Sequence, residues 1–410
     1  MTAIKRAGAA GFAGKTRRST LAPQQAVSPS VTHVGKFYPP HMGGIETHLQ
    51  TLSNELSRWI GLRVIVANEA RDMRQEMVDG IAVTRLAKLA TIKSMPICPQ
   101  LAAALRSVRS DIVHLHLPNP AALIAYLMSG RRGPLVLTWH SDPVRQKLLW
   151  RVLAPLHRWF VRSATQCIAT SPDYIESSPI LSVHRERCRV IPYGIPMERF
   201  AEPGNAVGEL RCRYGPRIVL AVGRLTYYKG FEYLMRAMAQ ISGKLVLIGD
   251  GPLRARLERG ASETGVRERV FFAGEIDNSK LAPYYHAADV FVLPSVERAE
   301  AFGIVQLEAM SCGKPIVNTR LSTGVPFVSI DGLTGITVPP RDPLSLAQAI
   351  TRLLDDTELR AQYGAAAIRR VRSEFTADRM GARTLALYRE IVSSVERSRT
   401  TAIADGATVQ

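Results

Sequence analysis

The sequence alternates short apolar runs with helical stretches, and it does so in two successive series. After a first run that begins at Val31, the first series has apolar runs at residues 62–67, 81–85, 112–117, 135–139, 166–169 and 189–192. The second series has runs at 217–225, 245–249, 270–274, 289–293 and 315–318. Apolar strands that alternate with helices are typical of a parallel sheet covered on both faces. The chain is therefore predicted to be an α/β protein with two doubly wound, Rossmann-like domains.

The length of the chain supports this division, because 410 residues exceed one ordinary hydrophobic core. The first 30 residues carry five basic residues and no acidic one, and they lack the apolar stretch of a secretory signal. We expect a disordered basic tail at 1–30, a first domain at 31–195, an irregular connector at 196–216 and a second domain at 217–375. A final helix over about 376–398 is long enough to return to the first domain.

The charge of the chain is strongly positive and unevenly distributed. Of the net +18, most lies in residues 1–200, which hold 26 Lys and Arg against 12 Asp and Glu. A nucleic acid, an anionic membrane surface or a pyrophosphate-bearing substrate would each suit such a surplus, and so would a solvated Arg-rich surface. No apolar run approaches the roughly 18 residues of a membrane span. The five scattered cysteines indicate reduced thiols in a cytosolic protein.

The stretch 144–162 has the pattern of a basic amphipathic helix without any acidic residue. Its apolar positions include Leu148, Leu149, Val152, Leu156, Trp159 and Phe160, and its basic positions are 145, 147, 151, 158 and 162. Such helices with Trp often lie on anionic membranes. The alternative is a helix packed on its own domain and bent at Pro155. The charge surplus of the first half favours membrane contact.

A glycine pair follows the first predicted strand. Gly43 and Gly44 precede Ile45, Leu49, Leu52 and Leu56, which occupy one face of a helix. Glycines at the start of a helix let backbone N–H groups approach a ligand closely, as in phosphate-binding turns. A bare turn is the alternative. The position after the first strand of an α/β unit favours an anion site.

His140 directly follows the predicted strand at 135–139. In parallel α/β sheets, ligands bind at the carboxyl ends of strands. His140 is therefore a candidate for a hydrogen bond to a sugar hydroxyl or for charge stabilisation, with Asp142 orienting a neighbour. A surface histidine in a loop is the alternative.

Two cations follow the first strand of the second series. Arg224 and Lys229 lie between that strand and the next helix. Arg offers a planar fork of donors and Lys a compact charge, and together they suit a diphosphate leaving group. The next strand ends in the glycine turn Gly249-Asp-Gly251-Pro.

Two carboxylates eight residues apart, Glu300 and Glu308, enclose the segment Ala301-Phe302-Gly303-Ile304. If a helix begins after Gly303, its unpaired N–H groups form an anion site from backbone alone. Glu308 would then lie further along the same helix and reach a different part of the ligand. A ligand with a diphosphate between two sugars fits this arrangement.

Taken in this order, these motifs resemble the family 4 retaining glycosyltransferases of the GT-B fold. The resemblance covers about residues 31–392. The GT-B fold consists of two Rossmann-like domains that face a central cleft. The sequence of residues 293–308 is most similar to that of bacterial mannosyl- and rhamnosyltransferases of surface polysaccharide assembly. One departure is Ala301, because the family usually has Gly after the first Glu; a methyl there would narrow donor choice or shift the loop.

The resemblance also implies roles for individual residues. Glu308 would hold the ribose hydroxyls, and Glu300 with the backbone of Ala301, Phe302, Gly303 and Ile304 would hold the donor sugar and diphosphate. Arg224 and Lys229 would neutralise the departing diphosphate, together with the backbone of Gly43 and Gly44, and His140 would sit beside the donor sugar. The nucleotide-sugar site is expected to include Gly249, Gly251 and Glu275 as well. The catalytic candidates are His140, Arg224, Lys229 and Glu300.

The implied chemistry is displacement of a nucleoside diphosphate from the anomeric carbon by an acceptor hydroxyl, with retention. We expect neither a metal nor a cofactor, because the chain has no D-x-D motif and two cations take the place of Mg²⁺. A carboxylate nucleophile, as in retaining glycosidases, is not assigned.

The leading interpretation is a hexosyltransferase that acts in surface polysaccharide biosynthesis, in the cytoplasm at the inner face of the membrane. Its donor would be a GDP- or UDP-hexose, GDP-mannose being favoured, and its acceptor a lipid-pyrophosphate-linked glycan. A GT-B epimerase or phosphorylase is the enzymatic alternative. A basic nucleic-acid-binding protein is the other, but the expected motif spacings and aromatic–basic interleaving are absent, so no nucleic-acid partner is expected.

Overall fold

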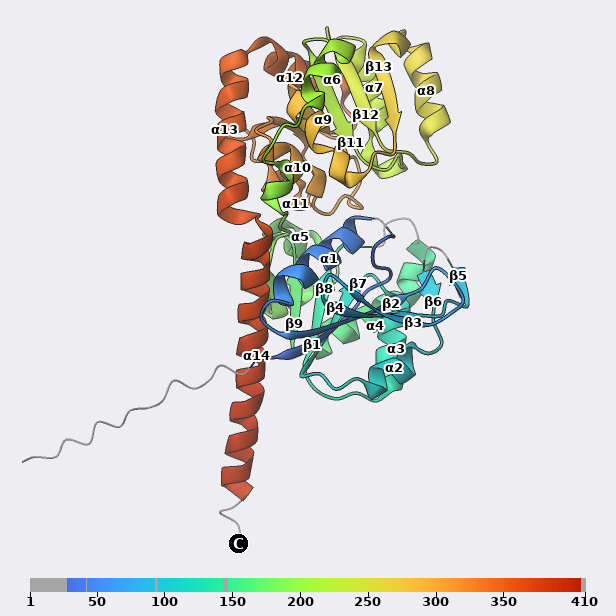
Figure 1. Cartoon of the computed structure of the whole chain (residues 1–410), viewed down its shortest axis with the longest axis vertical. Coiled ribbons are helices and arrows are strands. Elements are labelled where there is room, and N and C mark those ends of the chain that lie inside the picture. The colour runs from blue at the N-terminus through green and yellow to red at the C-terminus, as the bar shows by residue number, and fades with distance from the viewer. Residues whose placement is uncertain (1–27, 42, 93–94, 143–146, 407–410) are drawn as a thin grey trace, which may run out of the picture.

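The computed structural model describes residues 28–41, 43–92, 95–142 and 147–406 (Figure 1). The expected basic tail therefore lies almost wholly outside the described residues. Two sheets with their helices form two units, one above the other, and α13 and α14 run along one side of both (Figure 1). Within the described residues, no helix has both the length and the apolar character needed to span a bilayer.

The first unit is built on an eight-stranded sheet with the order β10-β9-β8-β7-β1-β2-β4-β3. All neighbouring strands are parallel except β3 and β4, which pair antiparallel. The strands are β1 (Ser30–Val34), β2 (Gly61–Ala67), β3 (Arg74–Val78), β4 (Ile81–Leu86), β7 (Ile112–Leu117), β8 (Leu135–Trp139), β9 (Gln166–Ala169) and β10 (Cys188–Val190). Strand β3 was not predicted because its sequence, RQEMV, is largely polar and exposed at the sheet edge.

Helices cover this sheet, as the apolar runs predict. They are α1 (Gly44–Leu56), α2 (Leu101–Ser107), α3 (Pro120–Ser129), α4 (Lys147–Ser163) and α5 (Pro172–Ser177), with the 3₁₀ segment η1 (Ser182–Arg187). A small antiparallel pair, β5 (Ala90–Ile92) and β6 (Met95–Ile97), lies beside them. On α4, Phe160 and Val161 are fully buried against the sheet, whereas Trp159 is 50% exposed.

The second unit is built on a six-stranded, wholly parallel sheet with the order β13-β12-β11-β14-β15-β16. The strands are β11 (Ile218–Val222), β12 (Lys244–Ile248), β13 (Val270–Gly274), β14 (Val290–Leu293), β15 (Ile316–Thr319) and β16 (Gly335–Val338). The helices are α7 (Phe231–Met238), α8 (Arg254–Glu263), α9 (Ala282–Ala287), α10 (Ile304–Ser311), α11 (Gly324–Val328), α12 (Pro343–Asp355) and α13 (Thr357–Glu374), and the 3₁₀ segments are η2 (Met197–Phe200), η3 (Tyr227–Lys229), η4 (Arg267–Arg269) and η5 (Asn278–Lys280). Because every strand is parallel, the carboxyl ends of all six lie at one edge.

The segment expected to be an irregular connector contains a helix, so that prediction was wrong for part of its length. Helix α6 (Ala206–Tyr214) buries Leu210 and Tyr214 in the core of the second unit. Turn residues on both sides, Pro203-Gly204 and Gly215-Pro216, made the whole stretch look irregular in the sequence. The helix is short, and its few apolar residues gave too weak a periodic signal to predict it.

The last helix, α14 (Ala377–Gly406), packs on the first unit. Its apolar residues share one buried cluster with β1, α1, β7 and β8; those from α14 are Met380, Leu385, Leu387, Tyr388, Ile391 and Val392. The chain crosses between the units twice, and the two crossings are hydrogen-bonded to each other. The Ile195 N–H donates to the Phe375 carbonyl at 2.9 Å, and the Ala377 N–H donates to the Ile195 carbonyl at 3.0 Å.

Candidate active site

The centre of the site in the second unit is a buried ion pair between Lys229 and Glu300. Lys229 Nζ lies 2.6 Å from Glu300 Oε2, and both side chains are only 9% exposed. Ser295 donates a further hydrogen bond to the same carboxylate oxygen at 2.8 Å. Burial lowers the pKa of Lys229, but the carboxylate of Glu300 outweighs that effect, so the pKa lies above its ordinary value. Lys229 therefore keeps its positive charge in a site with little solvent.

Glycines bring the two loops that carry this pair together. Gly230, next to Lys229, has φ +67°, and a Cβ there would lie 2.0 Å from the Pro294 carbonyl oxygen. A side chain at this position is therefore excluded both by the backbone conformation and by the neighbouring loop. The Val296 N–H also donates to the Tyr228 carbonyl at 2.8 Å. The Lys229 loop, after β11, thus packs directly on the loop after β14 that leads to Glu300.

Glu308 lies on α10 and is also buried. The Tyr285 hydroxyl donates to Glu308 Oε2 at 2.5 Å. Desolvation raises the pKa of Glu308, while the Tyr285 hydrogen bond and the charges of Arg199 and Lys229 act in the opposite direction. The structure thus brings Lys229 into the electrostatic environment of both predicted carboxylates.

Helix α10 begins directly after Gly303, as the sequence predicts. Gly303 has φ +75°, and a Cβ there would meet Leu293 and Gln306 at under 3 Å. No side chain caps this helix end. Phe302 is buried, and Ala301, the departure from the family pattern, is buried among residues of the first unit's core. The Ala301 methyl therefore contributes to packing between the two units.

The glycine turn after β12 supports the cation loop by backbone contact. A Cβ at Gly249 would lie 2.2 Å from the Gly223 carbonyl oxygen, and one at Gly251 would lie within 3 Å of Leu225. The Leu225 N–H also donates to the Asp250 carbonyl at 2.9 Å. These glycines therefore allow two loops to touch and so position the segment that carries Arg224.

Two predicted residues stand apart from the buried pair. Arg224 is exposed, and its side chain has no hydrogen bond or ion pair with the rest of the described chain. Glu275, which directly follows β13, is exposed too. Both nevertheless lie at the edge where the parallel strands end, the edge that also carries Lys229 and Glu300.

In the first unit, the glycine pair lies at the start of α1. Gly43 has extended backbone, and a Cβ there would lie 2.4 Å from Glu46 Oε2, so the Glu46 side chain folds back over the turn. The space beside Gly44 is open, with nothing within 4 Å of a Cβ built there. Lys36, which sequence reasoning missed, carries a positive charge near Glu46 and His140, and burial lowers its pKa.

His140 is buried at the end of β8, with both ring nitrogens paired inside the protein. Nε2 lies 3.0 Å from His116 Nδ1, and Nδ1 is hydrogen-bonded to the Tyr193 hydroxyl. Tyr193 in turn contacts Phe302 of the second unit, with ring centroids 4.9 Å apart. The structure thus brings His140 close to the loop of Glu300. A hydrogen bond from a His140 ring nitrogen to a sugar hydroxyl would have to replace one of these two partners.

A second ion pair joins the two units beside the site, and the sequence did not reveal its partner. Arg298 Nη2 lies 2.9 Å from Asp142 Oδ2, and Arg298 Nη1 donates to the Ser322 carbonyl at 3.0 Å. The guanidinium also stacks over the Tyr174 ring at 5.2 Å. Asp142 is two residues after His140, and Arg298 is two residues before Glu300. This bond therefore ties the two candidate loops together across the units.

Comparison with known proteins identifies the family. Residues 42–199 match the model of Glycosyltransferase Family 4, and residues 209–370 match that of Glycosyl transferases group 1. The O-antigen chain mannosyltransferase C of Escherichia coli is 30% identical over 368 residues, which cover 89% of this chain and 99% of that protein. The chain belongs to glycosyltransferase family 4. The D-rhamnosyltransferase WbpZ of Pseudomonas aeruginosa is 35% identical over 272 residues, 66% of this glycosyltransferase and 71% of the relative.

Solved structures agree with the GT-B fold of this glycosyltransferase. Sucrose-phosphate synthase from Thermosynechococcus elongatus superposes with a TM-score of 0.76 at 25% identity, over 89% of this chain and all of that one. HepE from Anabaena, solved with UDP and glucose, superposes with a TM-score of 0.73 at 20% identity, over 88% and 99% of the two chains. The family, the enzyme class and the two-sheet architecture predicted from the sequence are thereby confirmed.

Proposed function

We propose that this glycosyltransferase moves a hexose from a nucleotide sugar to a hydroxyl of a lipid-linked glycan in surface polysaccharide biosynthesis, with retention and without a metal. The observation that carries the proposal is the buried, charged Lys229 at the carboxyl edge of the second sheet, paired with Glu300. The second unit would bind the donor and the first unit the acceptor. The E. coli and P. aeruginosa relatives, named as an O-antigen mannosyltransferase and a D-rhamnosyltransferase, support the polysaccharide assignment.

Each residue of the site takes a role that fits its surroundings. Lys229 stabilises the departing diphosphate, and Arg224, being free of protein partners among the described residues, is available to join it. Glu300 orients Lys229 and accepts from donor-sugar hydroxyls. Glu308 holds the ribose, with Tyr285 fixing its carboxylate. The backbone N–H groups at the start of α10 and at Gly44 add donors for the diphosphate.

The reaction proceeds by front-face displacement. The acceptor oxygen forms a bond to the anomeric carbon on the face from which the diphosphate oxygen departs, and the acceptor proton passes to the departing diphosphate. Negative charge grows on the leaving group in this step. Preorganised cations in a site with little water stabilise such charge strongly, and here two side chains supply it without Mg²⁺. GDP-mannose is the favoured donor, and the name of the E. coli relative, a mannosyltransferase, supports mannose as its sugar.

The decisive experiment is a transfer assay with the purified full-length protein, with EDTA present throughout. Candidate GDP- and UDP-hexoses are offered together with lipid-pyrophosphate-linked acceptors, and the anomeric configuration of the product is determined by NMR. Transfer with retention in EDTA is the expected result. Inversion at the anomeric carbon would rule out the mechanism, and activity that appears only after Mg²⁺ is added would rule out metal independence.

Replacing Glu308 by alanine is expected to weaken binding of the nucleoside diphosphate about 10- to 100-fold, because hydrogen bonds to a charged group contribute roughly 1.5–3 kcal/mol each. Isothermal titration calorimetry with the free nucleoside diphosphate measures this directly. Tyr285→Phe should give a smaller loss, since the carboxylate remains but loses its support. Unchanged affinity in Glu308→Ala would remove this residue from the nucleotide site.

We also propose that the first unit binds an anionic membrane through α3 and α4. The two helices are neighbours, with the Tyr126 and Phe160 rings in edge contact at 6.1 Å. Large apolar side chains on both are exposed, namely Ile124, Leu127, Met128 and Trp159. Arg158 and Arg162 are exposed beside Trp159. The remaining predicted basic and apolar positions at 144–152 lie where side chains are not described.

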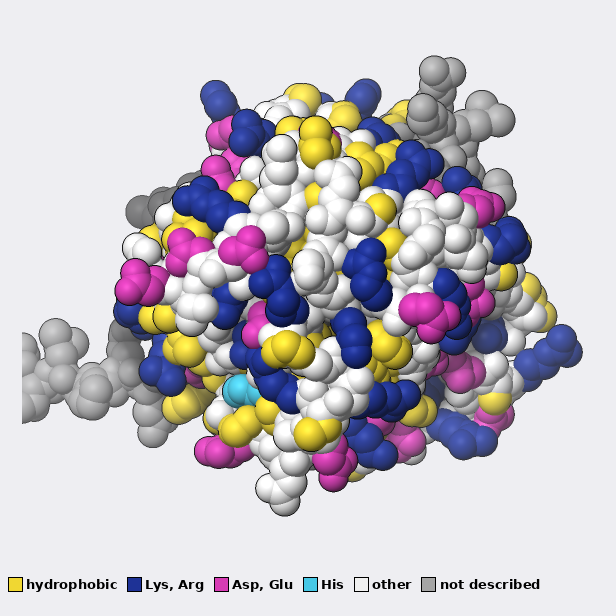
Figure 2. Space-filling model, turned by 90° about the horizontal axis from the view of Figure 1, so that it is seen from above, with side chains coloured by type: hydrophobic (Ala, Val, Ile, Leu, Met, Phe, Trp, Pro, Cys, Tyr) yellow, Lys and Arg dark blue, Asp and Glu magenta, His cyan; other side chains and the backbone are white. Residues whose placement is uncertain are grey.

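The charge distribution supports this choice of unit. Figure 2 looks down on the second unit, where Lys and Arg side chains are interspersed with Asp and Glu. Residues 31–200 hold 21 Lys and Arg against 12 Asp and Glu, a net charge of +9, whereas residues 201–410 hold 27 against 23, a net charge of +4. Each basic residue near an anionic surface contributes about 1 kcal/mol to binding, and exposed apolar residues add to it.

Sedimentation with vesicles tests the membrane proposal. The protein is expected to bind vesicles that contain phosphatidylglycerol and to bind phosphatidylcholine vesicles only weakly. A triple variant, Arg158→Gln/Trp159→Ala/Arg162→Gln, should lower the partition coefficient at least 10-fold, whereas the control Arg256→Gln/Arg259→Gln on α8 should not change it. Equal binding of the triple variant and the control would exclude this surface.

A further inference from the structure

One unbroken series of hydrogen bonds runs through the core of the first unit. It joins seven buried side chains that come from β1, β7, β8, α14 and the segment after β10. In order they are Tyr193, His140, His116, His33, Tyr388, His114 and Thr138. We call this series the histidine chain. It begins beside the candidate active site and ends at Thr138, next to the carboxyl end of β8 and two residues before His140.

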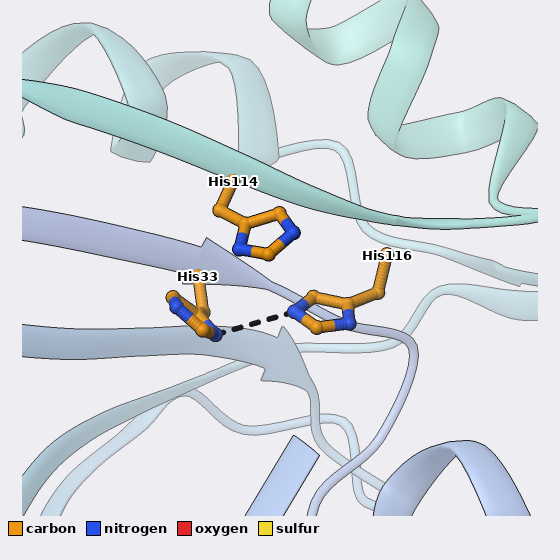
Figure 3. Close-up of side chains that lie close together, drawn as sticks. All are labelled: His33, His114 and His116. Atoms are coloured by element: carbon orange, nitrogen blue, oxygen red, sulfur yellow. Dashed lines mark hydrogen bonds between the residues drawn. The ribbon is translucent and has the colours of Figure 1, made fainter. Parts of the chain in front are cut away.

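The contacts of the histidine chain are short. His116 Nε2 lies 3.2 Å from His33 Nδ1, and the Tyr388 hydroxyl lies 2.9 Å from His33 Nε2 and 2.6 Å from His114 Nδ1. His114 Nε2 lies 2.6 Å from Thr138 Oγ1. Figure 3 shows three of the rings, with the bond between His33 and His116 dashed. The Tyr388 hydroxyl is therefore the link between two halves of the chain.

The strand register explains why these rings meet. His114 and His116 are two residues apart on β7, so their side chains leave the same face of the sheet. His33 on β1 is the direct partner of His114 in the parallel ladder. Helix α14 lies over this face and supplies Tyr388. A polar row is thus enclosed between an apolar sheet and an apolar helix.

All four rings are neutral at physiological pH. Burial lowers the pKa of His33 to about 3, and burial together with the neighbouring histidines lowers those of His114, His116 and His140 well below the ordinary value. A neutral imidazole has one N–H, so a ring between two partners donates from one nitrogen and accepts at the other. At each ring, the direction of one hydrogen bond therefore fixes the direction of the other.

Two arrangements make all six bonds and also let the Tyr388 hydroxyl donate to one of its two neighbouring rings. In the first, the Tyr193 hydroxyl donates to His140 Nδ1, and every later group donates onward, ending at Thr138. In the second, all donors are reversed, His140 carries its proton on Nδ1, and the Tyr193 hydroxyl hydrogen is released for another acceptor. In a third arrangement the Tyr388 oxygen accepts from both neighbouring rings, which leaves its own buried hydroxyl hydrogen without an acceptor in the histidine chain. A buried unsatisfied group costs about 1–3 kcal/mol, so this arrangement and those that break a bond are disfavoured.

We propose that the histidine chain acts as one two-state unit. Tyr388 of α14 is the positioning residue that couples His114 and Thr138 at its far end to His140. The proposal rests on the proposed function in so far as His140 and Tyr193 face the donor. Its consequence for the reaction is specific. Toward the donor, the Tyr193 hydroxyl is therefore either a hydrogen-bond acceptor or a hydrogen-bond donor. Which of the two it is depends on side chains of β1, β7 and α14.

A metal site is the competing interpretation of these histidines. The ring nitrogens of His33, His114 and His116 lie within 4.8 Å of one another, as do those of His48, His116 and His140. However, every ring nitrogen of the histidine chain already has a hydrogen-bond partner, whereas His48 is buried with neither nitrogen bonded. The arrangement therefore favours hydrogen bonding over coordination, and the experiment below separates the two.

The test reads the tautomers directly by long-range ¹H–¹⁵N NMR of the full-length protein with labelled histidine. Tyr193→Phe removes the partner of His140 Nδ1, so His140 should carry its proton on Nε2, and His116, His33 and His114 should do likewise. Thr138→Val removes the partner of His114 Nε2, so all four protons should move to Nδ1. The two variants change opposite ends and are expected to give opposite tautomers at every ring.

The role of Tyr388 is tested by adding Tyr388→Phe to each end variant. His114 should then no longer follow Tyr193→Phe, and His140 should no longer follow Thr138→Val. Tyr214→Phe, which removes a buried phenol in the second unit, is the matched control and should leave the coupling intact. Tautomers that change only at the ring next to each substitution would overturn the proposal. So would a 1:1 shift of several ring signals with Zn²⁺ that disappears in His48→Gln.

Kinetics distinguish failure of this inference from failure of the proposed function. Tyr388→Phe is expected to lower kcat roughly 10-fold, the effect of one lost hydrogen bond that acts in the transition state, while KM for the donor changes little. If the tautomers change together in the end variants but Tyr388→Phe leaves kcat unchanged, the two-state unit stands and His140 has no part in the reaction. Uncoupled tautomers together with loss of activity in His140→Ala would leave the proposed function standing and overturn the role of Tyr388.

Discussion

Lys229→Ala is expected to reduce kcat about 10²- to 10³-fold, with a much smaller effect on the affinity for the nucleoside diphosphate. Removing one preorganised group that stabilises developing charge typically costs this much. Lys229 is the cation of the buried pair with Glu300, whereas Arg224, the other cation proposed for the site, is exposed to solvent. Steady-state kinetics with the identified donor, combined with calorimetric binding of the nucleoside diphosphate, separates the two effects.

Stability must be controlled in this experiment, because the substitution leaves the Glu300 carboxylate buried without its cation. Breaking such a pair costs about 3–5 kcal/mol. The double variant Lys229→Met/Glu300→Gln removes both charges and should recover much of that stability while remaining inactive. Lys314→Ala, at a half-buried lysine bonded to the His286 carbonyl, is the matched control and should stay active. Full turnover in Lys229→Ala would remove this lysine from leaving-group stabilisation.

The free energy of unfolding is expected to fall steeply as the pH drops below about 6.5. Five buried histidines are neutral in the folded protein, and for His33 and His48 burial lowers the pKa to about 3. The unfolded chain binds protons on these rings near pH 6.5, whereas the folded protein does not. The unfolded state therefore binds more protons between pH 6.5 and 3, and stability is lost as the pH falls through this window.

The expected size of the effect is large. For each such ring, the free energy of unfolding is expected to be about 2 kcal/mol lower at pH 5 than at pH 8. The total free energy of unfolding of a protein is typically about 5–15 kcal/mol. Urea unfolding at pH 8, 6.5 and 5 measures it. His48→Leu should remove about one ring's share of the pH dependence, because its nitrogens have no partners that the change would leave unsatisfied.

The sequence was sufficient to predict most of the fold, because a parallel sheet covered on both faces requires continuous apolar strands. Strands β7, β8 and β11 are buried at every position, and their apolar runs were enough to locate them in the sequence. Strand β3, in contrast, is an exposed antiparallel edge and carries no such signal. Gly303 was informative too, since it has positive φ and stands directly before α10, the helix that carries Glu308.

The parts of the site that could not be predicted depend on contacts between distant segments. Nothing near Tyr388 in the sequence indicates that its hydroxyl lies between two histidines more than 270 positions away. Asp142 was recognised as a strand-end residue, but its partner Arg298 lies in the other unit. Such pairings are created by the docking of α14 and of the two units, and local patterns contain no information about docking.

The docking of α14 also has a consequence for the order in which the protein is made. The first unit completes its core only with Met380, Leu387 and Tyr388, which the ribosome adds after the whole second unit. At about 5–20 residues per second, the intervening stretch of about 180 residues takes roughly 10 to 35 s to synthesise. During that time the nascent first unit exposes the face that α14 will cover, with the polar row of histidines open to water. Full assembly of the first unit therefore has to wait until the second unit has been synthesised, and chains that stop before residue 377 would present an apolar surface to chaperones and proteases.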